Sequence, residues 1–396
     1  LYLLALEPVS ECASDPNSYG FRKGRSTHDA RSQLFVSLSQ KASAQWILDA
    51  DITGFFDNIN HDWLLANVHM NKRVLRKWLK AGVVDRGQLH RTEMGTPQGG
   101  IISPTLANIT LNGLERGLKQ YLKKELGSKA ADQVKVNLVR YADDFVVTGD
   151  SKELLATRVK PWIVEFLRER GLQFSEEKTK IVHIDEGFDF LGWNFRKYSG
   201  KMLIKPSKKN VQTFYRKVKE IISGNKAAKQ GNLIWVLNPV IRGWTQYHRH
   251  QVASEVFSRM DALIFRALWN WAKRRHNKKG AWWIRSKYFH HIGNRKWTFA
   301  APDVREDARE NGMTKLLYCG EVTIKRHIKV KAEYNPFDPS WELYGERLRQ
   351  LDGGVDVHAA HHAVAADVGV NHRHHAVILK TAGQVDHVVV GDLGPA

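Results

Sequence analysis

Cysteine is scarce in this sequence, because only Cys12 and Cys319 occur among its 396 residues. Two cysteines so far apart, without metal-ligand spacing, support neither a disulfide framework nor a cysteine-based zinc site. Long apolar runs are missing as well, since no stretch approaches the roughly 20 residues that a membrane-spanning helix needs. These absences argue against disulfide-rich secreted proteins and membrane proteins. They predict a cytoplasmic protein of bacterial type, with an organelle as the alternative, that does not bind a membrane.

Acidic residues are also few relative to basic ones. The chain has 61 Lys and Arg against 41 Asp and Glu, a formal charge of +20. An excess of this size, spread along the chain, favours nucleic acid as a partner over an anionic membrane. A general basic RNA-binding protein is one hypothesis that would explain this charge.

Two neighbouring carboxylates interrupt the apolar stretch VKVNLVRYADDFVVTG, residues 134–149. The β-branched and aromatic residues on both sides predict the strands of a hairpin, with Asp143 and Asp144 at its turn. Adjacent like charges repel unless a cation lies between them, and carboxylate oxygens are the ligands that magnesium prefers. An ordinary acidic turn is the alternative for this stretch alone. Asp51, which ends a short apolar strand beginning at Trp46, is the natural third ligand.

Basic residues gather in a glycine-bracketed loop near the start of the chain. Arg22, Lys23 and Arg25 lie around Gly20 and Gly24. Such a loop is flexible and suited to contact a phosphate backbone. A solvated basic loop without a partner is the alternative.

Basic amphipathic helices are predicted between residues 205 and 288. One of them carries a basic stripe of residues seven apart, namely Arg259, Arg266 and Lys273. Acidic residues are too scarce here to balance the stripe, so we expect it to bind RNA. Arg274 and Arg275 follow directly, and the aromatic pair WW at 282–283 adds rings on which bases can stack.

Six segments resemble, in order and spacing, the reverse transcriptases encoded by group II introns. They are SYGFRKGRS, LDADITGFFDNINH, GTPQGGIISPTLANI, YADDFVV, LQFSEEKTK and FLGWNF. Further along, IRGWTQYHRH, LWNWAKRRH and a KYF triplet resemble the maturase, or thumb, domain of the same family. One such segment is weak support, whereas six in order are strong.

The resemblance implies an α+β fold. We expect a right-hand polymerase palm with partial fingers over residues 1–200 and an α-helical maturase domain over residues 201–290. A small basic appendix would follow over 291–350. By its composition, the histidine-rich tail 351–396 is expected to be disordered or frameshifted, with a metal-binding tract as the alternative, and we assign it no function.

The resemblance also implies two Mg²⁺ ions. It makes Asp51 and Asp143 the main metal ligands, with Asp144 beside them, and it includes Ile52 among the residues that bind metal and nucleotide.

Three further residues match positions of the family that handle the incoming nucleotide. Phe56 matches the gate whose ring excludes a ribonucleotide 2′-hydroxyl, and Gln98 matches the loop residue near the nucleotide. Lys178 matches the lysine that stabilises or protonates the departing pyrophosphate.

The expected function is therefore RNA-directed DNA polymerisation combined with assistance to intron splicing. The expected partners are group II intron RNA, an RNA template with a DNA primer, and deoxynucleoside triphosphates. The family's first basic blocks should precede Leu1, and the HNH nuclease of many relatives is not found. The alternative is an RNA-binding maturase that has lost polymerase activity through N-terminal truncation.

Overall fold

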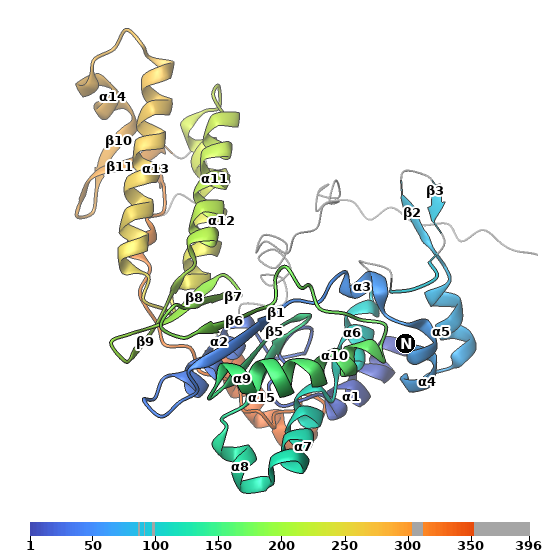
Figure 1. Cartoon of the computed structure of the whole chain (residues 1–396). Helices are drawn as coiled ribbons and strands as arrows, with labels where there is room; N and C mark the ends of the chain where they lie inside the picture. The colour runs from blue at the N-terminus through green and yellow to red at the C-terminus, as the bar shows by residue number, and fades with distance from the viewer. Residues whose placement is uncertain (86–87, 91, 97–99, 303–311, 352–396) are drawn as a thin grey trace, which may run out of the picture.

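A four-stranded antiparallel sheet is the centre of the N-terminal half of the protein (Figure 1). The computed structural model describes residues 1–85, 88–90, 92–96, 100–302 and 312–351. The sheet has the order β4-β5-β1-β6. Its strands are β1 (Trp46–Ala50), β4 (Asn137–Tyr141), β5 (Asp144–Gly149) and β6 (Lys180–His183). The predicted hairpin and the predicted strand before Asp51 are therefore both present, as neighbours in one sheet.

The two faces of this sheet are buried against different partners, because successive side chains of a strand point to opposite faces. Leu48 and Phe145 belong to a hydrophobic cluster shared with the surrounding helices. Ile47 and Val146 belong to a second cluster, formed with α2 and a small neighbouring sheet. Burial on both faces explains why β1 and β5 are apolar along most of their length and why their acidic residues stand out.

Short helices make up the rest of the N-terminal half. They are α1 (Tyr2–Ala13), α2 (Thr27–Leu38), α3 (Phe55–Asn58), α4 (His61–Asn67), α5 (Lys72–Leu79), α6 (Ser103–Leu111), α7 (Leu114–Leu126), α8 (Ser128–Gln133), α9 (Lys152–Leu154) and α10 (Lys160–Arg168), with a π-helical turn at Leu155–Val159 between the last two. A two-stranded ribbon is formed by β2 (Val83–Asp85) and β3 (Gln88–His90).

A three-stranded sheet leads from the first half into the second. It consists of β7 (Phe188–Phe190), β8 (Trp193–Tyr198) and β9 (Lys201–Pro206). The predicted hairpin over FDFLGWNF is thus present, and it gains β9 as a third strand. The boundary expected at residue 200 falls in the turn between β8 and β9.

The second half is helical, as predicted, and stands apart from the central sheet in Figure 1. Its helices are α11 (Lys208–Gly224), α12 (Gln230–His248), α13 (Ser254–Arg275) and α14 (Ala281–Tyr288). A three-stranded sheet of β10 (Phe289–Ile292), β11 (Arg295–Pro302) and β12 (Met313–Lys315) shares their hydrophobic core, for example through Phe289 and Phe299. The α+β class with a palm-like sheet followed by a helical domain is confirmed.

The expected single appendix over 291–350 is wrong. Its first part completes the helical domain through β11, β12 and a 3₁₀ turn at Cys319–Glu321. Its second part, with a 3₁₀ turn at Pro339–Trp341 and α15 (Glu342–Leu351), returns to the N-terminal half. His327 Nε2 lies 2.9 Å from Asp29 Oδ1, and the Val330 amide donates to the same oxygen at 2.9 Å. Contacts about 300 residues apart in sequence cannot be read from local pattern. The tail beyond Leu351 lies outside the described residues.

Three histidines lie where the two halves and this returning segment meet; His248 is buried, and His28 and His250 are half-buried. His28 Nε2 is 2.9 Å from the Tyr247 carbonyl oxygen, and His250 Nδ1 is 2.5 Å from that of Lys325. His248 Nε2 is 2.9 Å from Asn210 Oδ1. Burial lowers the pKa of His248 to about 3 and that of His250 to about 4, and it also lowers the pKa of His28. We call His28, His248 and His250 the junction histidines.

Candidate active site and nucleic-acid-binding surface

The turn between β4 and β5 is tight, because Tyr141 pairs directly with Asp144 and only two residues lie between them. The first of these, Ala142, has a left-handed backbone with φ of 56°. That conformation is uncommon for a residue with a side chain and occurs mainly in tight turns and at functional sites. The turn presents Asp143 and Asp144 at the end of the hairpin.

Buried polar contacts support this turn from behind. The fully buried guanidinium of Arg140 donates to the Ala142 carbonyl oxygen at 3.1 Å and to Asn108 Oδ1 at 3.3 Å. Asn108 Nδ2 in turn donates to the Gly20 carbonyl oxygen at 2.9 Å. Sequence reasoning missed Arg140 and Asn108. An arginine inside an apolar strand was the one available signal, because a buried charge needs partners.

Asp51 lies beside the turn because of the register of the sheet. Ala50 pairs with Phe145, so Asp51 and Asp144 follow as neighbours at the same edge. The Asp51 carbonyl oxygen accepts a hydrogen bond from the Ser175 amide at 2.8 Å. Lys178 Nζ lies 2.7 Å from Asp51 Oδ2. The structure thus brings together four predicted residues, namely Asp51, Asp143, Asp144 and Lys178.

The carboxylates of this cluster strongly affect one another. Burial, followed by the negative charges of Asp143, Asp51 and Asp49, raises the pKa of Asp144 to about 8. Burial, followed by Asp189 and Asp51, raises the pKa of Asp49 to about 7. The hydrogen bond to Asp51 raises the pKa of Lys178. Sequence reasoning missed Asp49, although its position two residues before Asp51 places it on the same strand face.

The chemistry of these residues fits a divalent cation, although their arrangement is not that of a finished metal site. Within the described ranges, no three His, Cys, Asp or Glu side chains are grouped so that they could hold a metal ion. Asp144 nevertheless has the carboxylates of Asp143, Asp51 and Asp49 as neighbours, which after burial contribute to its raised pKa, and an added cation would reduce their mutual repulsion. The Lys178 ammonium now supplies part of that positive charge at Asp51.

The predicted nucleotide-contact residues have different surroundings. Phe56, in α3, is half-buried and packs edge-on against Phe55 and Phe21. Ile52 is buried in the core, with 3% of the residue exposed, so its side chain is not presented to a metal or nucleotide. Gln98 lies outside the described residues.

The exposed basic loop predicted at residues 22–25 is wrong for two of its three cations. Arg22 forms a buried two-bond pair with Glu11, at 2.8 and 2.5 Å. Arg25 is buried and donates to the carbonyl oxygens of Ala332 and Tyr334. Their guanidinium groups hold the fold together and are not presented to a phosphate backbone. Lys23 pairs with Glu7 and remains partly exposed.

The basic stripe on α13 is on the surface, since Arg259, Arg266 and Lys273 are all exposed. Arg274 and Arg275 at the end of α13 are exposed too, but Arg275 also donates to the carbonyl oxygens of Lys226 and Ala228. Part of its role is therefore to fix the loop between α11 and α12.

Exposed aromatic rings lie near the end of this helix. Trp282 is 75% exposed, and the Arg285 guanidinium is 5.2 Å from its ring and 5.1 Å from that of Trp297. Rings held in this way by a cation are suited to stack on unpaired bases.

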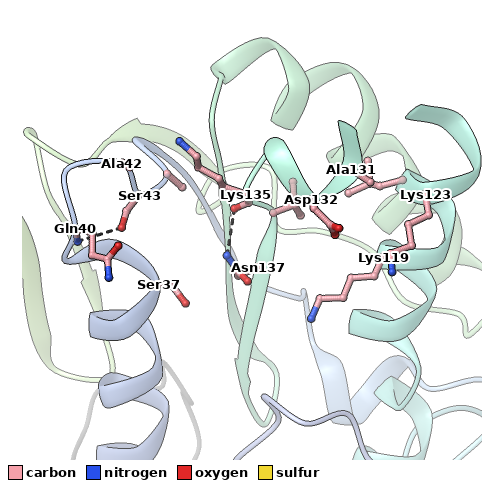
Figure 2. A pocket seen from close by; sticks show the side chains of 13 residues that line it. Ser37, Gln40, Ala42, Ser43, Lys119, Lys123, Ala131, Asp132, Lys135 and Asn137 are labelled. Carbon is pink, nitrogen blue, oxygen red and sulfur yellow. Dashed lines mark hydrogen bonds between the residues drawn. The ribbon is translucent and has the colours of Figure 1, made fainter. Parts of the chain in front are cut away.

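A cavity of about 510 Å³ lies elsewhere, between the end of α2 and the α7–α8 pair. Figure 2 shows Lys119, Lys123 and Lys135 around it, with Asp132 among them. None of the predicted site residues lines this cavity. Among the helices that the structure describes, none is long and apolar enough to cross a membrane.

Two family models match the chain, one over its N-terminal half and one over the helical domain that follows. Residues 1–195 match the family described as reverse transcriptase (RNA-dependent DNA polymerase). Residues 211–289 match the family described as group II intron, maturase-specific domain.

Individual relatives cover part of the chain each. The Escherichia coli protein YkfC is 31% identical over 227 residues, which are 48% of this chain and 58% of that protein. The group II intron-encoded protein LtrA of Lactococcus lactis subsp. cremoris is 30% identical over 250 residues, covering 49% and 41%. Maturase-like protein 1 of Euglena gracilis is 29% identical over 268 residues, covering 63% and 51%. The chain spans about half the length of these curated relatives.

The similarity of this chain to solved structures is weaker than its similarity to these relatives. Apo telomerase from Candida tropicalis, truncated from its C-terminal domain, is 16% identical with a TM-score of 0.36, covering 50% of this chain and 44% of that one.

Proposed function

This chain belongs to the family of reverse transcriptases and maturases encoded by group II introns, and from that membership we propose that it copies RNA into DNA and binds intron RNA to assist splicing. The proposed polymerase activity rests on one observation. Asp51, Asp143 and Asp144 lie together at one edge of the sheet, and the Lys178 ammonium is 2.7 Å from Asp51.

The carboxylates of Asp51, Asp143 and Asp144, with the Ile52 carbonyl, would hold the two Mg²⁺ ions that reverse transcriptases generally use. When bound, such ions activate the primer 3′-hydroxyl and neutralise the leaving pyrophosphate. Asp144 must lose its proton to bind a cation, since its pKa is raised to about 8.

Lys178 has two successive roles in this proposal. In the described state its ammonium neutralises Asp51. With a cation bound beside Asp51, the Lys178 ammonium would be able to donate a hydrogen bond or a proton to the departing pyrophosphate. Phe56 would lie against the sugar of the incoming deoxynucleotide and exclude a 2′-hydroxyl, and Gln98 would contact the same nucleotide.

RNA binding is assigned to the helical domain and rests on exposed charge. The basic stripe and Arg274 offer cations to the phosphates of intron RNA and of the template–primer duplex, and Lys23 adds one from the N-terminal half. The exposed rings near Trp282 add base stacking.

Primer extension on an RNA template, together with a measurement of RNA affinity, tests the polymerase part and the RNA-binding part of the proposal. The parent chain should extend a DNA primer in Mg²⁺, and Asp143→Ala with Asp144→Ala should abolish extension while leaving RNA affinity nearly intact. Extension that survives both substitutions would refute the site. The second candidate function, a maturase without polymerase activity, is favoured if the parent binds intron RNA and promotes splicing yet extends no primer.

A further inference from the structure

Phe21 has an unusual backbone for an aromatic residue. Its φ is 56°, in the left-handed region that bulky side chains rarely adopt. Its ring does not enter the core, since the residue is 46% exposed. Backbone strain without compensating burial points to a role for the ring where it stands.

The neighbours of Phe21 force it into this position. A Cβ added to Gly20 would lie 2.2 Å from the Ala142 amide nitrogen, so the chain passes directly against the turn that carries Asp143. On the other side, Arg22 is tied to Glu11 and to the Ser18 carbonyl oxygen. Phe21 is thus held between two fixed points and projects from between them.

The ring of Phe21 meets the predicted sugar gate. Its centroid is 6.3 Å from that of Phe56, with an interplanar angle of 69°. Phe55 contacts the same ring at 5.2 Å, and the Phe56 carbonyl oxygen accepts from the Thr96 amide at 2.7 Å. The Phe56 backbone is therefore fixed by Thr96, while its ring is fixed by Phe55 and Phe21.

We propose that Phe21 is a positioning residue for sugar selection: it holds the Phe56 ring in place, and thereby sharpens discrimination against ribonucleotides. The proposal rests on the gate role given to Phe56 above. It also ties that gate to the metal-binding turn, because the same short segment touches both Phe56 and Ala142.

The test compares incorporation of dCTP and CTP, which differ only at the 2′ position, in Mg²⁺-dependent primer extension. Phe21→Ala should narrow the preference for dCTP over CTP about two- to tenfold, the range expected when one aromatic contact is lost. Phe21→Tyr, which keeps the ring, should restore it. If Phe21 acts through Phe56, then Phe21→Ala should change nothing further in a Phe56→Ala background. Phe35→Ala removes a similarly exposed ring, 43% against 46%, from α2 and should leave the preference unchanged.

A merely structural role would slow both nucleotides equally and leave their ratio intact, and that result would overturn the proposal. A second measurement does not depend on polymerase activity. With 4-fluorophenylalanine at position 56, the fluorine NMR line should shift in Phe21→Ala and stay in place in Phe35→Ala. If the parent extends no primer, the polymerase function fails while the fluorine shift still decides whether Phe21 holds the ring. An unchanged line in Phe21→Ala refutes the contact itself.

Discussion

Replacing Gly20 by Ala should disturb the acidic turn without touching any acidic residue. The added Cβ would lie 2.2 Å from the Ala142 nitrogen and 2.9 Å from its Cα, whereas ordinary contacts begin at 3.4 Å. The backbone at Ala142 would have to shift by about 1 Å to make room, because backbone atoms cannot rotate away as the end of a side chain can. Overpacking of this kind costs about 1–3 kcal/mol of stability. A displacement of about 1 Å in catalytic groups can lower a rate by about 10²-fold.

Urea denaturation and primer extension measure the two effects separately. Gly243→Ala in α12 is the matched control, because its added Cβ meets no atom within 4 Å and alanine favours a helix. We expect the control to keep its extension rate and to gain about 0.5–1 kcal/mol in free energy of unfolding. Gly20→Ala with parental stability and parental extension would show that the close approach of Gly20 does not hold the turn at Ala142.

Three further outcomes are expected. Neutralising the basic stripe by three Gln substitutions should flatten the slope of log RNA affinity against log salt by roughly two to three units, since each phosphate contact contributes about 0.7–0.9; an unchanged slope would mean that the stripe does not contact phosphate. The junction histidines should weaken the folded protein between pH 6.5 and about 4, at up to about 1.4 kcal/mol per pH unit each, because they are neutral when folded and take up protons when unfolded. Asp144 and Asp49, whose pKa values are raised in the folded chain, oppose this loss over the same range; urea titrations in which His248→Gln leaves the pH dependence of stability unchanged would contradict the burial of His248. Asp29→Asn should cost about 1–3 kcal/mol, because it weakens the buried bonds to His327 and Val330; thermal unfolding at pH 7 measures it, and a loss below 0.5 kcal/mol would argue against the docked returning segment.

The local sequence pattern was sufficient to predict the strands and the helix on which the candidate site residues lie. The strand ending at Asp51 and the hairpin around Asp143 follow from runs of β-branched residues, and the register of an antiparallel sheet then brings them together. The stripe on α13 was predictable for the same reason, since a helical period fixes which residues share a face.

Long-range pairing was not predictable. Whether Arg25 faces solvent depends on carbonyl groups 307 and 309 residues further along the chain. The burial of Arg22 depends on Glu11 in α1, and a sequence motif of basic residues and glycines looks the same in either case. The supporting role of Arg140 required the positions of Asn108 and Ala142, which only the fold supplies.

Binding of Mn²⁺ tests most directly the central claim that these carboxylates form a metal-dependent catalytic centre. Mn²⁺, as a stand-in for Mg²⁺, can be titrated into the folded chain and its free fraction followed by electron paramagnetic resonance. We expect Mn²⁺ binding that tightens as the pH rises from 7 to 8, as Asp144 loses its proton, and that disappears in Asp143→Ala with Asp144→Ala. Equal Mn²⁺ binding by the parent and by this double variant would contradict the central claim.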